Sequence, residues 1–458
     1  MTILFETQNS SNLSTLNSRS IPETIDALKR AGYSTQDLAR MRHIHVAGTK
    51  GKGSVCAFAT SILKRYTDVG TFTSPHLTSP RERIALNGEP ISQELFTASF
   101  FNLWDRYTQS SLAEGKSQDF AHGPDSKPFY FRFLAILAWH IFLQQGIKSV
   151  VMECGIGGEH DATNILPADA VSAAVVAQLG IDHVAMLGET VEEIAWHKAG
   201  VFKKGVKGFT VASPSQPGVM RVLRSRAEEK GAELIELEED VLSAWDGVRG
   251  ILQGDFQKSN QALALLAVKA HLGMDTEPVS SLKSIPDTMV TGLKEARIRG
   301  RCEVLQQDNI RWLLDGAHTK ESLQQVAKWL AQTIRPNESL SLIFNVQERN
   351  ITELLTVLME AIQVETQRPD VVSRAIFTPN EQLAATAEEG DRDLSLQQMG
   401  ADAMQRLSPS CAVEVCESLS QAIASAREST TKDSSVLVTG SMRLVGTTLL
   451  EIEPDALV

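Results

Sequence analysis

The chain has 458 residues, and because hydrophobic cores stop growing at about 250–300 residues we expect two domains. Hydrophobic residues make up 42% and charged residues 22%, which is ordinary for globular proteins and excludes wholesale disorder. The formal net charge of −12 argues against a general nucleic-acid binder, which needs a basic face.

The first strand–helix pair surrounds the strongest motif in the chain. Residues 43–47 have the pattern of a strand, and residues 54–66 repeat apolar side chains at helical spacing. Between them lies Gly48-Thr49-Lys50-Gly51-Lys52-Gly53-Ser54. Such a turn lets backbone N–H groups approach phosphate oxygens, and the N-terminus of the following helix adds a positive dipole. Only two residues separate Gly48 from Gly51, so the spacing differs from the usual GxxxxGK[ST], and a plain glycine turn with two solvated lysines is the alternative.

The rest of the N-terminal half continues the alternation of helix and strand. We expect helices at 130–143 and 190–202, and buried strands at 149–153 and 171–177. The polar stretch 109–128 contains two glycines and two prolines, which indicates a long surface loop. Such an alternation predicts a mainly parallel sheet that is covered on both faces.

A second alternation follows a boundary near 292–302 and predicts a smaller α/β domain. Its expected strands are 310–314, 340–344, 373–377 and 435–439, and its expected helices are 321–333, 352–363 and 443–451. Residues 386–402 have the composition of a solvated acidic loop. The predicted fold class is α/β. A P-loop-type, mainly parallel sheet domain (1–296) precedes a smaller Rossmann-like α/β domain (297–458).

Four polar residues outside the glycine turn stand in places where chemistry is common. Glu153 ends an apolar strand, at the edge where α/β sites lie. Ser74 lies in a TSPH turn and His183 ends GIDH; alone, each is more typical of a structural role. Lys198 lies near apolar residues on a predicted helix, and a buried lysine has a depressed pKa and can react with carbon dioxide.

The order of several long motifs resembles that of the folylpolyglutamate synthases, the folate branch of the Mur-ligase superfamily. The resemblance runs from about residue 20 to the end, in its eukaryotic, fungal-like variant. The motifs that carry it are HIHVAGTKGKGSVCAF (43–58), FTSPHLTSPRERIALNGEPIS (72–92), ECGIGGEHDATN (153–164), LGIDHVAMLGETVEEIAWHKAGVFKK (179–204), GDFQKSNQA (254–262), LDGAHTKES (314–322), IFNVQER (343–349) and LVTGSMRLVG (437–446).

The resemblance implies roles for individual residues. It implies an ATP-binding N-terminal domain of the Mur-ligase central type and an amino-acid-binding C-terminal domain. ATP would contact Gly48, Thr49, Lys50, Gly51, Lys52, Gly53, Ser54, Asn260, Arg301 and Asp315. Magnesium would lie near Ser74, Glu153, His183 and a carbamylated Lys198, and a monovalent cation such as K⁺ is a further candidate. Lys52, Lys198 and His318 would be catalytic, and Pro75, His76, Arg83, Asn345 and Arg349 are candidates for substrate contact.

The sequence departs from the family pattern at a few positions. Phe256 replaces the first polar residue of HQxxNA. Lys320 stands in place of a proline, Arg443 in place of a histidine, and QERN (347–350) in place of GDRD. The last three changes lie in the C-terminal domain, where the amino acid should bind, so they bear on substrate identity more than on ATP chemistry.

The expected function is ATP-dependent addition of L-glutamate to the γ-carboxylate of a reduced folate through an acyl phosphate, in a cleft between two domains hinged near 292–302. Alternatives are dihydrofolate synthase, a ligase of the same scaffold acting on a non-folate carboxylate, a P-loop kinase and a non-catalytic nucleotide-binding regulator. Residues 40–83 contain eight basic and two acidic residues, so the presumed site is locally basic despite the acidic total.

Location and assembly follow from what the chain lacks. Its five cysteines are few and odd in number, with no repeated CxxC, which favours reduced thiols inside a cell. The polar N-terminus carries no signal-type apolar run, and no apolar stretch reaches the length of a membrane span. We therefore expect a cytoplasmic monomer without nucleic-acid or membrane partners, and mitochondrial routing stays open.

Overall fold

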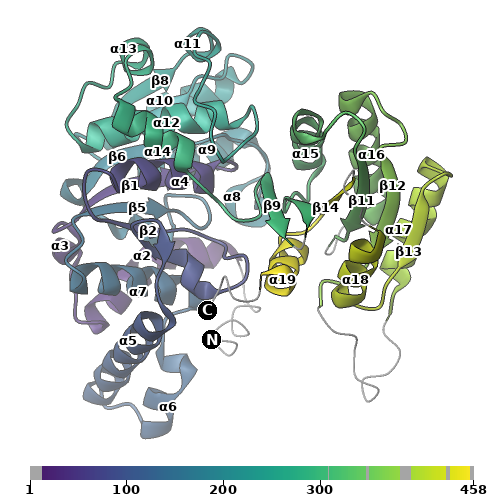
Figure 1. Ribbon diagram of the computed structural model, residues 1–458. Coiled ribbons are helices and arrows are strands. Elements are labelled where there is room, and N and C mark those ends of the chain that lie inside the picture. Colours follow the sequence, from purple (N-terminus) through teal and green to yellow (C-terminus); the bar gives the residue numbers. More distant parts are fainter. Residues whose placement is uncertain (1–12, 308, 347–349, 382–392, 430–433, 454–458) are drawn as a thin grey trace. The chain divides into compact units, whose positions relative to one another are not determined.

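The computed structural model describes residues 13–453 apart from 308, 347–349, 382–392 and 430–433 (Figure 1). The chain divides into two compact units. Unit 1 comprises the chain to His76, Pro80–Gly250 and Phe256–Arg297. Unit 2 comprises Leu77–Ser79, Ile251–Asp255 and the chain from Ile298.

Unit 1 is built on an eight-stranded sheet, counted over the described residues, in the order β4-β3-β2-β5-β1-β6-β7-β8. All neighbours are parallel except the pairs β2–β3 and β3–β4. The strands are β1 (Arg42–Ala47), β2 (Val69–Phe72), β3 (Ile84–Leu86), β4 (Glu89–Pro90), β5 (Ser149–Glu153), β6 (Val171–Val176), β7 (Lys207–Val211) and β8 (Glu233–Leu237).

Helices cover both faces of this sheet, as an alternating chain requires. The α-helices of unit 1 are α2 (Leu13–Arg30), α3 (Thr35–Leu38), α4 (Lys52–Leu63), α5 (Gln93–Ala113), α6 (Gln118–His122), α7 (Tyr130–Gln144), α8 (Val184–Leu187), α9 (Val191–Lys198), α10 (Pro217–Lys230), α11 (Glu239–Ser243), α12 (Gln257–His271), α13 (Pro278–Lys283) and α14 (Asp287–Glu295). The short 3₁₀ turns are η1 (Pro80–Arg83), η2 (Pro124–Ser126), η3 (Ala162–Ile165), η4 (Ala168–Ala170) and η5 (Ala199–Val201).

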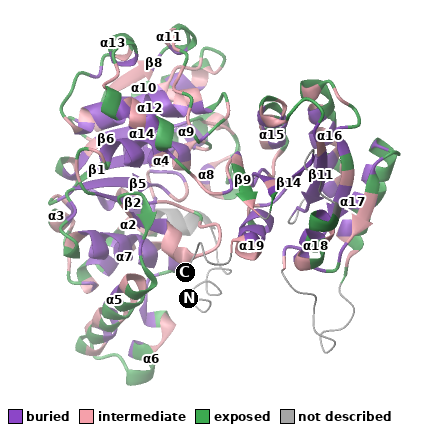
Figure 2. Ribbon diagram, in the orientation of Figure 1, coloured by how far each residue is buried: buried purple, intermediate pink, exposed green. Residues whose placement is uncertain are grey.

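The register of the central strands sets the position of the site. Strand β1 lies between β5 and β6, with Val46 opposite Glu153 and Ala47 opposite Val176. Apart from Arg42 at the start of β1 and Ser172 in β6, the residues of these strands are buried (Figure 2), which is typical of central strands in a parallel sheet. The loops that follow β1, β5 and β6 therefore open side by side at the carboxyl edge of the sheet.

Unit 2 has a six-stranded sheet among its described residues, in the order β13-β12-β11-β14-β10-β9, antiparallel only between β9 and β10. The strands are β9 (Glu303–Gln307), β10 (Ile310–Leu314), β11 (Ser339–Phe344), β12 (Val372–Phe377), β13 (Ala412–Val415) and β14 (Ser434–Thr439). The helices are α15 (Lys320–Thr333), α16 (Ile351–Thr366), α17 (Ser395–Leu407), α18 (Leu419–Ser429) and α19 (Met442–Ile452). Both sheets are mainly parallel, so the predicted α/β class is confirmed.

The expectation of a long loop at 109–128 is wrong. Helix α5 continues to Ala113, and the stretch also contains α6 and η2. Ser117 caps α6 by accepting the N–H of Phe120, and the Lys127 ammonium is buried among the Thr108 hydroxyl, the Ser126 hydroxyl and the Ala121 carbonyl. Ser111, Ser126 and Lys127 are buried, whereas residues 114–120 are exposed. The sequence argument failed because it took an exposed polar stretch for a loop, although such a stretch can form a capped helix.

The acidic loop expected at 386–402 is also wrong in part. Residues 386–392 lie outside the described residues, but Ser395–Leu407 forms α17, which buries Ala403 and Met404 against the core of unit 2. The predicted strands and helices on either side of the glycine turn and in unit 2 are confirmed to within a few residues. No helix in the described part of the chain combines the length and the apolar character that crossing a membrane requires.

Candidate functional site

The glycine turn lies at the carboxyl end of β1 and is fastened to the segment that follows β6. The N–H groups of Thr49 and Lys50 both donate to the Gln178 carbonyl, at 2.8 and 3.1 Å. The Thr49 hydroxyl donates to the Gly180 carbonyl at 3.0 Å. Gly48 has a φ of 149°, and a Cβ there would lie 2.9 Å from the Cβ of Ala177, so only glycine fits this approach.

Helix α4 begins two residues earlier than the sequence pattern suggested. Gly51 is its N-cap in the left-handed conformation (φ 83°), and Lys52 opens the helix. The Lys52 Nζ atom donates to the Gly48 carbonyl at 3.1 Å, and Ser54 is buried in the first turn. The free N–H groups of the first turn and the Lys52 ammonium together make this end of α4 strongly positive.

Asn260 on α12 packs directly against the turn. A Cβ on Gly51 would lie 2.3 Å from the Oδ1 atom of Asn260. The Asn260 amide is buried and donates to the Gln257 Oε1 atom at 2.9 Å, which fixes its orientation. The structure thus brings the predicted Asn260 to the glycine turn from a segment more than 200 residues further along the chain.

Lys198 reaches the same turn from the last residue of α9. Its Nζ atom donates to the Gly48 carbonyl at 2.7 Å, and the residue is 2% exposed. Burial, and then the charge of Lys52, lower the pKa of Lys198 to about 8. Burial thus favours the neutral amine more than it is favoured in an exposed lysine.

Glu153 ends β5 beside the turn and is 3% exposed. Its Oε2 atom accepts the backbone N–H of Ser74 at 3.1 Å, which joins the end of β5 to the TSPH segment. The Ser74–Pro75 peptide bond is cis. A Cβ on Gly53 would lie 3.9 Å from the same Glu153 oxygen, so this carboxylate faces the N-terminal turn of α4.

Asp161 organises the loop after β5 and was absent from the predicted site. Its carboxylate accepts the N–H groups of Gly155 (2.9 Å), Ile156 (3.0 Å) and Thr163 (2.9 Å). Burial nevertheless raises its pKa above the ordinary value for an aspartate. The residue lies within the GGEHDATN motif, so the motif itself was the signal that could have found it.

His183 stands at the edge of this group. It adopts a left-handed conformation (φ 50°) at the start of α8, and its Nε2 atom lies 3.6 Å from the Asp182 carboxylate. Partial burial lowers its pKa, while Asp182 acts in the opposite direction. Within the described residues, no three His, Cys, Asp or Glu side chains lie close enough together to hold a metal ion.

His76 and Arg83 form a second small cluster in unit 1. The Arg83 Nε–H donates to the His76 Nδ1 atom at 2.9 Å, and the guanidinium lies 5.3 Å from the centre of the Tyr130 ring. Burial lowers the pKa of both His76 and Arg83. Tyr130 opens α7 and gave no signal in the sequence.

In unit 2, Asp315 follows β10 and is buried. Its oxygens accept the N–H groups of Cys302 (2.8 Å) and Ala317 (2.9 Å). Burial raises its pKa, while the Arg301 charge acts to lower it. The His318 Nδ1 atom lies 2.9 Å from the Gly316 carbonyl and must donate to it, so in the neutral ring Nε2 carries no proton.

Asn345 is buried between two other amides at the carboxyl edge of the unit 2 sheet. Its Nδ2 donates to the Oδ1 atom of Asn380, and its own Oδ1 accepts the Gln397 amide, both at 3.1 Å. The sequence analysis predicted a role for neither Asn380 nor Gln397. Gln397 lay in the stretch that was expected to be an acidic loop. Arg349 lies outside the described residues.

Two of the residues that depart from the family pattern, Lys320 and Arg443, have charged partners, whereas residues 347–349 lie outside the described residues. Lys320 pairs with Glu353, and Arg443 lies 3.8 Å from Glu381. Phe256 precedes α12 as its N-cap residue and is 38% exposed. At Lys320 and Arg443 the substituted cation therefore lies beside a carboxylate.

The geometry of the site is that of a phosphate-binding protein. A glycine-rich turn joins a central parallel strand to a helix N-terminus, with a basic side chain and a carboxylate beside it; such an arrangement suits a phosphate-bearing ligand. Residues 299–451 match a family model described as "Dihydrofolate synthetase, C-terminal domain".

Comparison with curated proteins gives the family. The chain is 38% identical to the folylpolyglutamate synthase of Neurospora crassa, over 96% of this chain and 86% of that protein. It is 40% identical to a folylpolyglutamate synthase of Saccharomyces cerevisiae, over 80% of this chain and 66% of that protein. The chain belongs to the folylpolyglutamate synthase family.

Solved structures share the fold at lower identity. The Mycobacterium tuberculosis folylpolyglutamate synthase complexed with ADP superposes with a TM-score of 0.72 at 22% identity, covering 99% of this chain and 97% of that chain. Escherichia coli FolC in complex with DHPP and ADP gives a TM-score of 0.68 at 22% identity, covering 98% and 99%.

Proposed function

We propose that this protein is an ATP-dependent acid–amino-acid ligase that adds L-glutamate to the γ-carboxylate of a reduced folate. Family membership over nearly the whole chain supports this activity. The observation that carries it is the meeting of Lys52, Lys198 and Glu153 around the Gly48 turn. The similar solved structures from Mycobacterium tuberculosis and Escherichia coli are complexes with ADP, which agrees with nucleotide binding at such a turn.

In this proposal the phosphates of ATP bind at Gly48–Ser54 of unit 1. The free N–H groups at the start of α4 would donate to phosphate oxygens, and Lys52 would exchange its bond to the Gly48 carbonyl for one to the β- and γ-phosphates. Asn260, held against Gly51 by Gln257, would contact the nucleoside. Lys50 adds a second positive charge to the turn.

The residues at the turn suit magnesium, which prefers oxygen ligands. Glu153 offers a buried carboxylate, Ser74 a hydroxyl and His183 a nitrogen at the edge. Bound magnesium would neutralise phosphate charge during transfer. A monovalent cation such as K⁺ is a further proposed ligand of this region.

Lys198 would complete that oxygen set after carbamylation. Its neutral amine nitrogen would attack the carbon of CO₂, an N–C bond would form, and one proton would leave to give a carboxylate-like side chain. The burial of Lys198, with a pKa near 8, supports such a reaction. The change would also remove the repulsion between two neighbouring lysine cations.

The ligation itself would proceed in two steps. A γ-carboxylate oxygen of the folate attacks the γ-phosphorus of ATP, an O–P bond forms, and the bond to the β–γ bridging oxygen breaks to release ADP. The glutamate amine then attacks the acyl carbon, an amide bond forms, and inorganic phosphate leaves. His318 would take the amine proton on Nε2, because its Nδ1 proton is committed to the Gly316 carbonyl.

Unit 2 would supply the contacts to glutamate and part of those to ATP. Asp315 and Arg301 are proposed for the nucleotide, and Asn345 and Arg349 for glutamate or phosphate. The three-amide network around Asn345 would keep its amide in one orientation. Pro75, His76 and Arg83 of unit 1 are proposed for the folate.

The test uses purified protein with MgATP, L-glutamate and tetrahydrofolate. The expected result is phosphate release together with a folate product heavier by one glutamyl residue. Lys52→Met should abolish both. Phosphate release that stays at background, while another carboxylate supports it, would remove the folate assignment.

A second candidate activity is dihydrofolate synthesis, because the matching C-terminal family model bears that name. The two activities differ in the acceptor, dihydropteroate in one case and a folate in the other. Replacing tetrahydrofolate by dihydropteroate in the same assay therefore separates them. A kinase would yield a phosphorylated product that does not proceed to an amide.

A further inference from the structure

The loop after β5 and the end of α9 touch at backbone distance. The N–H of Glu159 donates to the carbonyl of His197, the residue before Lys198, at 2.6 Å. The Asn164 amide nitrogen bridges the two segments by donating to the carbonyls of Glu159 (3.2 Å) and Gly200 (3.1 Å). The backbone around Lys198 is thus bonded on both sides to the 155–164 loop.

Two glycines make this contact close. A Cβ on Gly158 would lie 2.7 Å from the His197 carbonyl oxygen and 2.8 Å from that of Lys198. A Cβ on Gly200 would lie 2.3 Å from the Cα of Glu159. Because these neighbours are backbone atoms, a side chain at either position would push the two segments apart.

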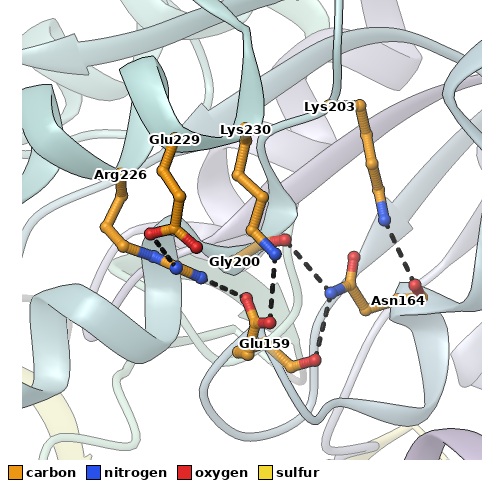
Figure 3. Close-up of polar contacts among 7 residues, drawn as sticks. All are labelled: Glu159, Asn164, Gly200, Lys203, Arg226, Glu229 and Lys230. Atoms are coloured by element: carbon orange, nitrogen blue, oxygen red, sulfur yellow. Dashed lines mark hydrogen bonds and ion pairs between the residues drawn. The ribbon is translucent and has the colours of Figure 1, made fainter.

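A cluster of charged side chains holds Glu159 from the other side (Figure 3). Its carboxylate pairs with Arg226 and, at 3.0 Å, with Lys230, both on α10. The Arg226 side chain is 4% exposed and its guanidinium lies 4.3 Å from the centre of the Trp196 ring on α9. Arg226 therefore contacts both the loop and the helix that ends in Lys198.

These contacts lead from α10 to the glycine turn. We propose that the Glu159–Arg226 pair is a positioning element that fixes the His197–Lys198 backbone and so places the Lys198 amine 2.7 Å from the Gly48 carbonyl. Neither Glu159 nor Arg226 touches a substrate in this proposal. The inference rests on the proposed function, because it gives the place where Lys198 works.

The charge of the pair matters as well as its packing. A buried guanidinium needs a counter-charge, and removing one partner leaves it uncompensated. Without the Glu159 charge, Glu229 is the carboxylate that still pairs with Arg226 among the described residues; it is 59% exposed and lies one helical turn away on α10 itself. Glu229 pairs with the same guanidinium, and within the described residues it makes no hydrogen bond or ion pair to the 155–164 loop. Glu229 is therefore a matched control.

The experiment compares Glu159→Gln with Glu229→Gln in the full chain. Steady-state kinetics would give kcat and the KM for MgATP and for tetrahydrofolate. Incubation with ¹³C-bicarbonate would give the intensity of a carbamate ¹³C signal, assigned to Lys198 by its loss in Lys198→Arg. For Glu159→Gln we expect kcat to fall roughly 10- to 100-fold, the range for partners that orient a site residue, with both KM values nearly unchanged and a weaker carbamate signal. Glu229→Gln should resemble the wild type.

Several results would overturn the proposal. The proposal is wrong if Glu159→Gln has the kcat of the wild type, or if kcat falls equally in Glu159→Gln and Glu229→Gln. It is also wrong if Glu159→Gln changes only the KM values. Should Glu159→Gln fail to fold, Arg226→Lys keeps the charge but not the planar fork, and it must show the same fall in kcat at constant KM. A wild type that performs no ligation would refute the proposed function instead, and the carbamate signals of the variants would then decide the positioning role. A wild type that ligates without a carbamate signal would refute carbamylation, and the kinetics alone would decide.

Discussion

Replacing Gly51 by alanine should damage the glycine turn more than its backbone angle alone predicts. Gly51 has a φ of 83°, and an added Cβ would lie 2.3 Å from the Asn260 Oδ1 atom. Asn260 is buried and bonded to Gln257, so it cannot swing away freely. Gly205 is the matched control, because it has a φ of 73° and no atom within 4 Å of an added Cβ.

The expected magnitudes follow from these two differences. A non-glycine residue in the left-handed region costs about 1–2 kcal/mol, which is all that Gly205→Ala should lose. In Gly51→Ala the Asn260 amide must also shift, and a buried amide that loses its partner costs about 1–3 kcal/mol. Gly51→Ala should therefore lose about 2–5 kcal/mol of the unfolding free energy of unit 1.

Hydrogen exchange of peptides from α4 and α12 in increasing urea would measure this loss within unit 1. The decisive comparison is Gly51→Ala in an Asn260→Ala background, where the obstructing atoms are gone and the cost should drop to that of Gly205→Ala. Equal costs for the two glycine variants in the wild-type background would refute the reasoning. So would an unchanged cost of Gly51→Ala after Asn260 is removed.

Three further predictions concern buried polar groups. Burial lowers the pKa of His271 to about 4, against about 6.5 in an unfolded chain, so below pH 6.5 the unfolded state binds a proton that the folded state does not. The contribution of His271 to the free energy of unfolding is thus constant above pH 7 and is lost as the pH falls toward 4, by about 2 kcal/mol at pH 5. The urea midpoints at pH 7.5 and pH 5 should therefore differ less in His271→Asn than in the wild type. An equal difference in the two proteins would contradict this prediction. Asp161→Asn turns one of the two carboxylate oxygens into an amide donor that faces N–H groups, which should cost about 1–3 kcal/mol. The loss should appear as faster exchange of the Gly155 and Ile156 amides or, in the other amide orientation, of the Thr163 amide, and unchanged exchange of all three would count against the structural role of Asp161. Gln397→Leu leaves the Asn345 Oδ1 atom without its donor and should lower the melting temperature of unit 2. An unchanged melting temperature would show that this hydrogen bond does not stabilise unit 2.

Much of the architecture was readable from local patterns. The apolar runs 149–153 and 171–177 indicated buried parallel strands, since only a sheet covered on both faces needs continuous rather than alternating apolar residues. The glycine turn between a strand and a helix predicted the position of the candidate site. Polar stretches were the weak point: 109–128 contains the end of α5, α6 and η2, and 395–402 lies in α17, although most of their polar side chains are exposed. Polarity indicates exposure, but it does not distinguish an exposed helix from a loop.

By itself the sequence determined where the glycine turn lies, through motif order the family, and the strands β1, β5, β6, β10, β11, β12 and β14; it missed β2, β3, β4, β7, β8, β9 and β13. Only the tertiary structure decided which side chains meet there. The order of the strands places β1 between β5 and β6, so Glu153 and Lys198 approach Gly48 although more than 100 residues separate them from it. Burial and contact between distant segments produce the depressed pKa of Lys198, the packing of Asn260 against Gly51 and the Glu159–Arg226 ion pair. Local sequence spacing does not encode such contacts.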